Sequence, residues 1–192
     1  MFDAIWIRGS GREPRTVLDA NFAPSRLGTL RTRNRAAYKG IYALLMEEQT
    51  KDWLSATKID FSSYFSESID IHHIFPVAWC EKNGIHRNDY NSIVNKTPLS
   101  GRTNRIVGGE APTRYLDRLK KHAGVDDDEF EAILRSHAVD PVQMYRDDFR
   151  GFFADRKERI LLRIEAAMGK EIPRAETFEE GEPAVENEDE DE

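Results

Sequence analysis

Cysteine is nearly absent from this sequence, since Cys80 is the single one among 192 residues. A lone thiol cannot form an intrachain disulfide, and it cannot supply a zinc cluster built on several cysteines. The length is sufficient for one domain with an apolar core. We expect Cys80, which follows Trp79 on a short helix, to be part of that packing.

Long apolar runs are absent as well. No stretch approaches the ~20 apolar residues that cross a bilayer, and residues 1–10 lack the apolar segment behind a basic start that marks a secretory signal. We therefore expect a cytoplasmic protein without membrane contact. Hydrophobic residues make up 39% and charged residues 33% of the chain, below and above the usual shares, which indicates a well-solvated and helix-rich protein.

The net charge of −7 argues against binding to nucleic acid, but the charges are unevenly distributed. Residues 171–192 hold 11 acidic side chains and one basic side chain, Arg174, so residues 1–170 carry a net charge of +3. Because residues 171–192 contain almost nothing that could build a core, we expect a disordered acidic tail there. Residues 1–30 are then an N-terminal extension and residues 31–170 the folded domain. Such a tail either solubilises the protein, competes with DNA for the basic body, or docks a partner.

Apolar residues at helical spacing dominate the folded domain. The first helix is predicted over residues 33–49, and its basic start is a candidate for phosphate contacts through Arg31, Arg33, Arg35 and Lys39. Capping residues and helix breakers predict four further helices. The first covers residues 112–122, the second runs from the capping box of Asp126 and Glu129 to residue 137, and the third starts at Asp140-Pro141. The fourth is a long last helix that is rich in core phenylalanines and ends near Gly169.

A different pattern interrupts these helices. Residues 69–75 are a strand candidate ended by Pro76, and residues 77–82 a short helix stopped near Gly84. Residues 93–99 are a second strand candidate, and Ser100 can cap a helix over residues 101–107. The sequence therefore predicts an α+β, mainly helical fold, with a small antiparallel hairpin packed against the helix that carries Asn104.

Two adjacent histidines, His72 and His73, occupy the end of the first predicted strand. Neighbouring side chains on a strand point to opposite faces unless the strand bends. A single histidine would most often be a surface or core residue, but Asp70, Asn95 and Asn104 accompany this pair. His86, His122 and His137 have no comparable motif, and we do not expect them to be ligands.

These residue types suit phosphodiester hydrolysis. The reaction needs an activated water, a cation that offsets developing negative charge, and fixed geometry. His73 can take the proton from water, because imidazole titrates near neutral pH. His72 and Asn104 can supply two metal ligands and leave room for water and phosphate oxygens. Whether Asp70 also binds the ion stays open.

The run His72-His73-Ile74-Phe75-Pro76, followed by Asn95 and by Asn104-Arg105, resembles the signature of HNH, or ββα-metal, endonucleases. The resemblance implies that His73 is the general base and that His72 and Asn104 bind the metal. It also implies that Asn95, the middle residue, pins the loop and helps to orient the base. The spacing between the two asparagines is similar to that in the HNH domain of RNA-guided CRISPR nucleases. Mg²⁺ or Mn²⁺ is the expected cofactor, and Ni²⁺ or Zn²⁺ would also be accepted.

A wider resemblance covers roughly residues 30–170. Segments 33–45, 69–80, 91–109 and 147–170 are together similar to the nuclease region of GmrSD-type modification-dependent restriction and anti-phage systems. In those systems a nucleotide-hydrolysing, DNA-sensing module is joined to the nuclease. This chain has no glycine-rich phosphate loop followed by Lys-Ser or Lys-Thr. The resemblance therefore implies that another chain supplies the sensor, or that this is the tail end of a larger ancestor.

The expected substrate is DNA, and Arg102, Arg105 and Lys96 are the candidates for phosphate contacts near the motif. The alternative is a non-catalytic DNA-binding or assembly module that retains the HNH fold. One nuclease site cuts one strand, so a double-strand break would require a homodimer or two visits to the DNA.

Overall fold

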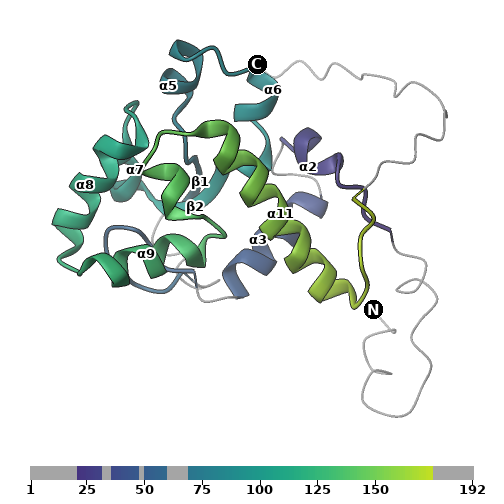
Figure 1. Ribbon diagram of the computed structural model, residues 1–192. Helices are drawn as coiled ribbons and strands as arrows, with labels where there is room; N and C mark the ends of the chain where they lie inside the picture. The colour runs from purple at the N-terminus through teal and green to yellow at the C-terminus, as the bar shows by residue number, and fades with distance from the viewer. Residues whose placement is uncertain (1–20, 32–35, 48–49, 60–68, 175–192) are drawn as a thin grey trace, which may run out of the picture.

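The computed structural model describes residues 21–31, 36–47, 50–59 and 69–174. Helices dominate these segments, and a two-stranded antiparallel sheet lies among them (Figure 1). The expected α+β, mainly helical class is thereby confirmed. Arg33 and Arg35, at the start of the first predicted helix, and residues 175–192 of the predicted tail lie outside the described residues.

The sheet consists of β1 (Ile69–His73) and β2 (Lys96–Ser100), paired so that His73 lies opposite Lys96. The connection between the strands contains α5 (Val77–Lys82), α6 (Arg87–Tyr90) and the short 3₁₀ helix η2 (Ile93–Asn95). The prediction that the second strand begins at residue 93 is wrong. The Asn95 amide instead donates to the backbone carbonyls of Phe75 and Tyr90, which keeps this part of the chain in a turn.

Helix α7 (Gly101–Val107) follows β2 without a loop, with the bounds that the sequence predicts. The Ser100 hydroxyl accepts a hydrogen bond from the Thr103 amide at 3.1 Å and so caps the helix. Helix α7 contacts both strands. Two strands and a helix therefore form one packed unit, as expected for the hairpin-plus-helix core.

The other helices surround this unit (Figure 1). The predicted caps Asp126 and Asp140 accept backbone hydrogen bonds at the starts of α9 and α10, and Asp148 does the same at the start of α11. Gly124 and Gly169 end α8 and α11 in the left-handed conformation, at φ of +68° and +67°, where glycine has no Cβ to clash. The bounds are α2 (Arg26–Thr29), α3 (Ala36–Glu47), α8 (Pro112–Ala123), α9 (Asp127–Ser136), α10 (Pro141–Met144) and α11 (Phe149–Met168).

Helix α11 joins two apolar clusters. Its first half supplies Phe149 and Phe152 to a cluster built mainly on α7, α8 and α9, which also holds Cys80. Its second half supplies Ile160 and Ile164 to a cluster built on α2 and α3. Cys80 is fully buried, as predicted, and burial raises the pKa of its thiol to about 12.

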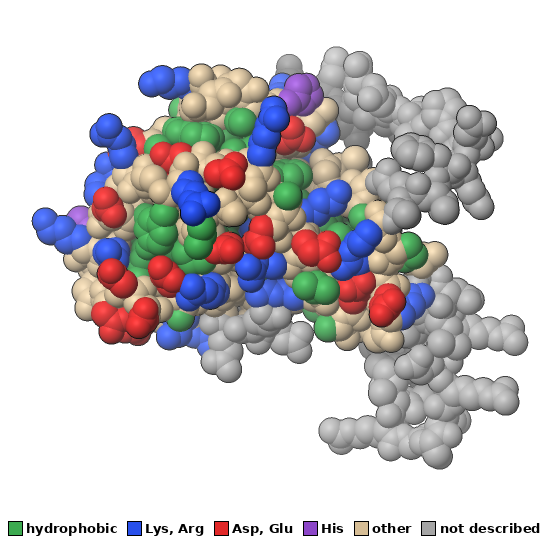
Figure 2. Space-filling view, viewed as in Figure 1, with side chains coloured by type: hydrophobic (Ala, Val, Ile, Leu, Met, Phe, Trp, Pro, Cys, Tyr) green, Lys and Arg blue, Asp and Glu red, His purple; other side chains and the backbone are tan. Residues whose placement is uncertain are grey.

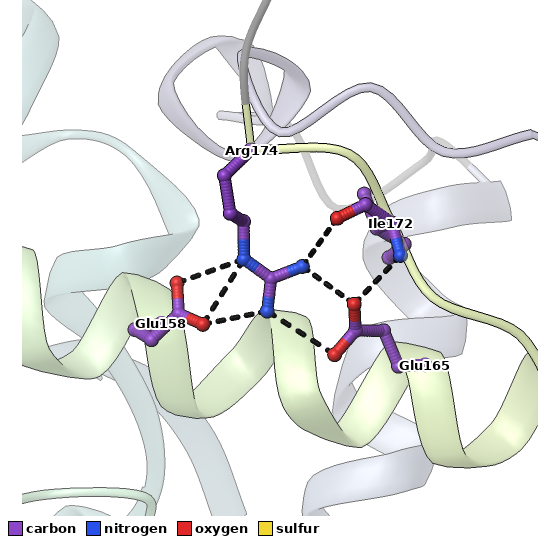
Figure 3. A network of polar contacts seen from close by, with 4 residues as sticks. All are labelled: Glu158, Glu165, Ile172 and Arg174. Carbon is purple, nitrogen blue, oxygen red and sulfur yellow. Dashed lines mark hydrogen bonds and ion pairs between the residues drawn. The ribbon is translucent and has the colours of Figure 1, made fainter.

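Both predicted flanks contribute residues to the body. Leu27 and Leu30, within the predicted N-terminal extension, are buried in the cluster around α3. At the other end Ile172 is buried, and Arg174 donates hydrogen bonds to both Glu158 and Glu165 of α11 (Figure 3). Ile172 and Arg174 therefore belong to the packed body, although the predicted tail includes them.

The described surface mixes both signs of charge. Figure 2 shows basic and acidic side chains interspersed over one face. None of the helices in the described segments is both long enough and apolar enough to traverse a bilayer.

Candidate functional site

The backbone just after His73 is held by one buried side chain. The Oδ1 atom of Asn95 accepts a hydrogen bond from the Phe75 amide at 2.8 Å, and its Nδ2 atom donates to the Phe75 carbonyl at 2.9 Å. The Asn95 carbonyl in turn accepts from the Ile74 amide at 2.9 Å. Asn95 thus connects the chain after β1 to the turn before β2.

Two residues from other helices complete this support. The Tyr115 hydroxyl of α8 donates to the Ile74 carbonyl at 2.7 Å. The buried guanidinium of Arg156 on α11 donates to the carbonyls of Val94 and Lys96, at 2.5 and 2.9 Å, which flank Asn95. The turn that carries Asn95 is therefore fixed from both sides, with its buried polar groups satisfied.

The His73 ring itself contacts a different asparagine. Its Nε2 atom lies 3.1 Å from Oδ1 of Asn91, in the turn after α6. With Oδ1 as the acceptor, Nε2 carries the hydrogen and Nδ1 is the nitrogen that can take up a proton. Burial lowers the pKa of His73 below its usual value near 6.5. The bond to Asn91 opposes this shift in part, whereas the positive charge of Lys96 adds to it. The imidazole is therefore neutral at pH 7, the state that a general base needs.

His72 and Asp70 occupy the other face of β1, since strand residues alternate. His72 is half-buried and lies opposite Thr97, whose hydroxyl is 2.6 Å from Nδ1 of the buried His137. The strand does not bend at the histidine pair, because both residues remain in the ladder. The structure therefore brings His73 together with Lys96 and His72 together with Thr97, on opposite faces.

Asn104 is half-buried on α7, one residue after Thr103. The carboxylate of Asp52 anchors this helix, accepting hydrogen bonds from the Thr103 hydroxyl at 2.6 Å and the Ser100 amide at 2.8 Å. Burial by itself would raise the pKa of Asp52, but these bonds outweigh it and lower the pKa below its usual value. An ionised Asp52 thus fixes α7, and with it Asn104, against the end of β2.

The predicted ligands offer a mixed donor set. His72 provides an imidazole nitrogen, Asn104 an amide oxygen, and Asp70, on the same face as His72, a carboxylate. Such donors suit Mg²⁺, Mn²⁺ and related divalent ions. Within the described part of the chain, no group of three or more His, Cys, Asp and Glu side chains is placed to hold a metal. A site here would therefore depend on the Asn104 amide and on ligands from water or substrate.

The predicted DNA contacts fall on two surfaces. Arg102 and Arg105 are exposed on α7, away from its buried residues Thr103 and Val107. Lys96 is half-buried at the start of β2, and its Nζ donates to the carbonyl of Arg31 at 3.3 Å. These positions leave the two arginines accessible to a large ligand.

The other histidines have structural contacts. His137 is fully buried, and its Nε2 lies 2.7 Å from the Lys51 carbonyl. Burial lowers the pKa of His137 to about 3, so it is neutral at pH 7. His86 caps α6 through Nδ1, and Nδ1 of His122 contacts the Arg118 carbonyl one turn earlier in α8.

Sequence reasoning missed four supporting residues. Asn91, Tyr115, Asp52 and Arg156 reach the motif from positions 18 to 62 residues away from the atoms they contact. Their sequence neighbourhoods carry no recognisable signal, because a contact of that separation depends on how the helices pack. Arg156 is a partial exception, because an arginine at helical spacing among apolar residues of the last helix can be read from the sequence.

Comparisons with known proteins give one similar sequence. No family model matches the chain, and no solved structure matches it. The chain is similar to the uncharacterized protein MJ0686 of Methanocaldococcus jannaschii, with 25% identity over 145 residues. The match covers 70% of this chain and 24% of the relative, so the chain spans about a quarter of the relative's length.

Proposed function

We propose that this protein is a metal-dependent DNA endonuclease of the HNH type. The observation that carries the proposal is the placement of His73, a neutral histidine at the end of β1 whose ring is oriented by Asn91 and whose following backbone is pinned by Asn95. The adjoining order of β2 and α7, with Asn104 on the helix, agrees with the arrangement that the resemblance implies.

His73 acts as the general base in this proposal. Its Nδ1 atom takes a proton from water, the water oxygen attacks the phosphorus, and the bond from phosphorus to the leaving oxygen breaks. Because Nε2 is held by Asn91, the ring presents Nδ1 without losing orientation. The Asn95 side chain hydrogen-bonds to backbone, so its role is to position the chain that follows the ring.

His72 and Asn104, with Asp70 as a further candidate, are the residues that would hold the ion. A divalent cation bound there would supply positive charge to the phosphate oxygens and the leaving oxygen. The donor types fit that role. Because the ladder places His72 and His73 on opposite faces of β1, a phosphate shared by the ion and the base would have to lie at the end of the strand, next to His73.

We propose that a partner or a further module, and not this domain, selects the DNA target. The similar region of MJ0686 is about a quarter of a longer chain, as expected for a nuclease unit that works with further modules. We therefore propose a place in a restriction or anti-phage system, with a nucleotide-hydrolysing DNA sensor supplied by a partner. Co-purification of the full chain with a nucleotide-hydrolysing protein from its host would support this assignment.

Cleavage of supercoiled plasmid in Mg²⁺ or Mn²⁺, with EDTA as the blank, tests the nuclease proposal. His73→Ala should reduce the rate at least on the order of 10²-fold, the usual contribution of a positioned base. His122→Ala, which removes an exposed histidine from α8, is the matched control and should cut at the wild-type rate. A folded His73→Ala protein that cuts as fast as wild type would refute the mechanism. DNA binding without any cutting by the wild type would favour the non-catalytic module.

Metal titration distinguishes the roles of the two adjacent histidines. His72→Ala and Asn104→Ala should weaken Mn²⁺ binding, whereas His73→Ala should retain it, because the base touches water. If both histidines only pack the sheet, metal affinity in all three variants would instead follow their melting temperatures.

A further inference from the structure

A cavity of about 420 Å³ opens beside the proposed base, and its lining is basic. It lies between the end of α2, helix α6 and the start of β2. Its volume falls within the range of ligand sites. The lining consists of Arg31, Arg87, Asn88, Asn91 and Lys96.

Among the described residues, the lining holds three cationic side chains, two amides and no carboxylate. Within the described segments neither Arg31 nor Arg87 forms an ion pair, although Arg118, Arg135, Arg159 and Arg174 each do. Both arginines are exposed. Arg31 and Arg87 carry like charges that repel each other, and a bound anion would relieve this repulsion, so the cavity favours an anionic ligand.

The positions of these cations are set by the fold. Helix α2 contacts both η2 and α6. The Leu30 carbonyl accepts from the Ile93 amide at 2.9 Å, and the Arg31 carbonyl accepts from Lys96 Nζ. Arg31 is thereby held close to β2 although it lies 65 residues away in sequence.

Two of the lining residues connect the cavity to His73. Asn91 lines it and contacts the His73 ring, and Lys96 lines it and lies opposite His73 in the ladder. An anion in the cavity would therefore sit next to the proposed base. By contrast, Arg102 and Arg105, the arginines that the motif suggested, do not line it.

We propose that this cavity binds backbone phosphate of the DNA strand that reaches the His73 face of β1, with Arg31 and Arg87 as phosphate contacts. This inference rests on the proposed function for its substrate class. Arg31 and Arg87 act as bidentate donors to phosphate oxygens, and Asn88 and Asn91 can donate through their amides. The assignment makes the α2–α6 edge, in addition to α7, part of the DNA-binding surface.

Salt-dependent binding of a short labelled DNA duplex, measured in EDTA so that no cleavage occurs, tests the assignment. Each phosphate contact contributes about 0.9 to the slope of log K against log salt, which is roughly an eightfold loss of affinity at about 0.1 M salt when one contact is removed. Arg31→Gln and Arg87→Gln should each show this loss, and together they should reduce the slope by about two. Arg135→Gln is the matched control, because α9 lies on the opposite side of the molecule from α2 and α6 (Figure 1).

The outcomes separate this assignment from the nuclease proposal. A double Gln variant whose slope equals that of Arg135→Gln would overturn the cavity as a phosphate site, even if the protein cuts DNA. A wild type without measurable DNA affinity would overturn it as well. A wild type that binds DNA through these arginines but never cuts would leave the site intact and end the nuclease proposal. Arg31→Lys with Arg87→Lys should keep the slope and lose part of the affinity, because lysine retains charge but not the bidentate contact.

Discussion

Asn91, and not Asn95, is the asparagine that touches the ring of His73. The HNH resemblance assigns orientation of the base to Asn95, whose side chain is instead fully engaged with the backbone of Phe75 and Tyr90. Asn95 therefore tethers the loop, whereas Asn91, four positions earlier, orients the ring of His73. Both Nδ2 hydrogens of Asn95 are donated to backbone carbonyls and its Oδ1 accepts from the Phe75 amide, so the Asn95 side chain is directed at the backbone and not at the imidazole.

Asn91 is accordingly expected to be a positioning residue. Asn91→Leu, which keeps the size but removes the acceptor, should lower the single-turnover cleavage rate on the order of tenfold at saturating protein. Asn91→Asp, which still accepts from Nε2, should restore most of it. Asn83→Leu, an exposed asparagine at the end of α5, is the control.

The pH profile separates this role from a loss of packing. Only neutral His73 can accept a proton, so the rate should rise with pH and level off above the pKa of His73, which burial places below its usual value. Loss of the Asn91 acceptor removes an interaction that raises this pKa, so the acid limb of Asn91→Leu should move to lower pH. Asn91→Asp should move it to higher pH. Identical limbs in all three proteins would contradict the assignment.

Among the helices, α11 fixes the position of the turn before β2, which carries Asn95. Arg156 reaches from the middle of this helix to three carbonyls, those of Val94, Lys96 and His137. Burial lowers the pKa of this guanidinium to about 10, which leaves it charged at pH 7. Burying a charged guanidinium that has only carbonyl acceptors costs free energy of desolvation. In return, Arg156 clamps α11 to the turn before β2.

Removal of this clamp should destabilise the whole protein. Arg156→Met keeps the apolar stem but leaves three carbonyls without their donor, each worth about 1–3 kcal/mol when buried. We expect a loss of at least about 3 kcal/mol in the free energy of unfolding, measured by urea denaturation. Arg159→Met on the same helix removes a partly exposed ion pair with Asp155 and should cost less than about 1 kcal/mol. Equal losses in the two variants would show that Arg156 is not a clamp.

At the scale of the molecule, charge is divided between the body and the chain end. Residues 175–192 hold ten acidic side chains and no basic one, so removing them changes the net charge from −7 to +3. Because Ile172 and Arg174 pack against α11, a deletion that begins at residue 175 leaves these contacts in place. Such a deletion keeps Ile172 and Arg174, the two residues of the predicted tail that contact α11.

Deletion of residues 175–192 should strengthen DNA binding at low salt, with a gain that disappears as salt screens the charges. Binding isotherms of the full chain and the shortened chain across a salt series measure this effect. The melting temperature of the two proteins serves as the control for folding. Affinity that is equal or lower in the shortened protein would mean that the tail does not compete with DNA and would leave the solubilising or docking role.

The local features of this protein can be read from its sequence. Helix starts and stops at Ser100, Asp126, Asp140 and Gly169 follow from side-chain capping and from backbone freedom, which act over three or four residues. The motif residues His73 and Asn95 could also be recognised, because residue type and spacing are properties of the sequence itself. Tertiary structure alone decided what surrounds them. Asn91 beside the His73 ring, Arg156 behind the Asn95 turn and Arg31 beside Lys96 are contacts between segments that the packing of helices brings together, and no local propensity encodes that packing.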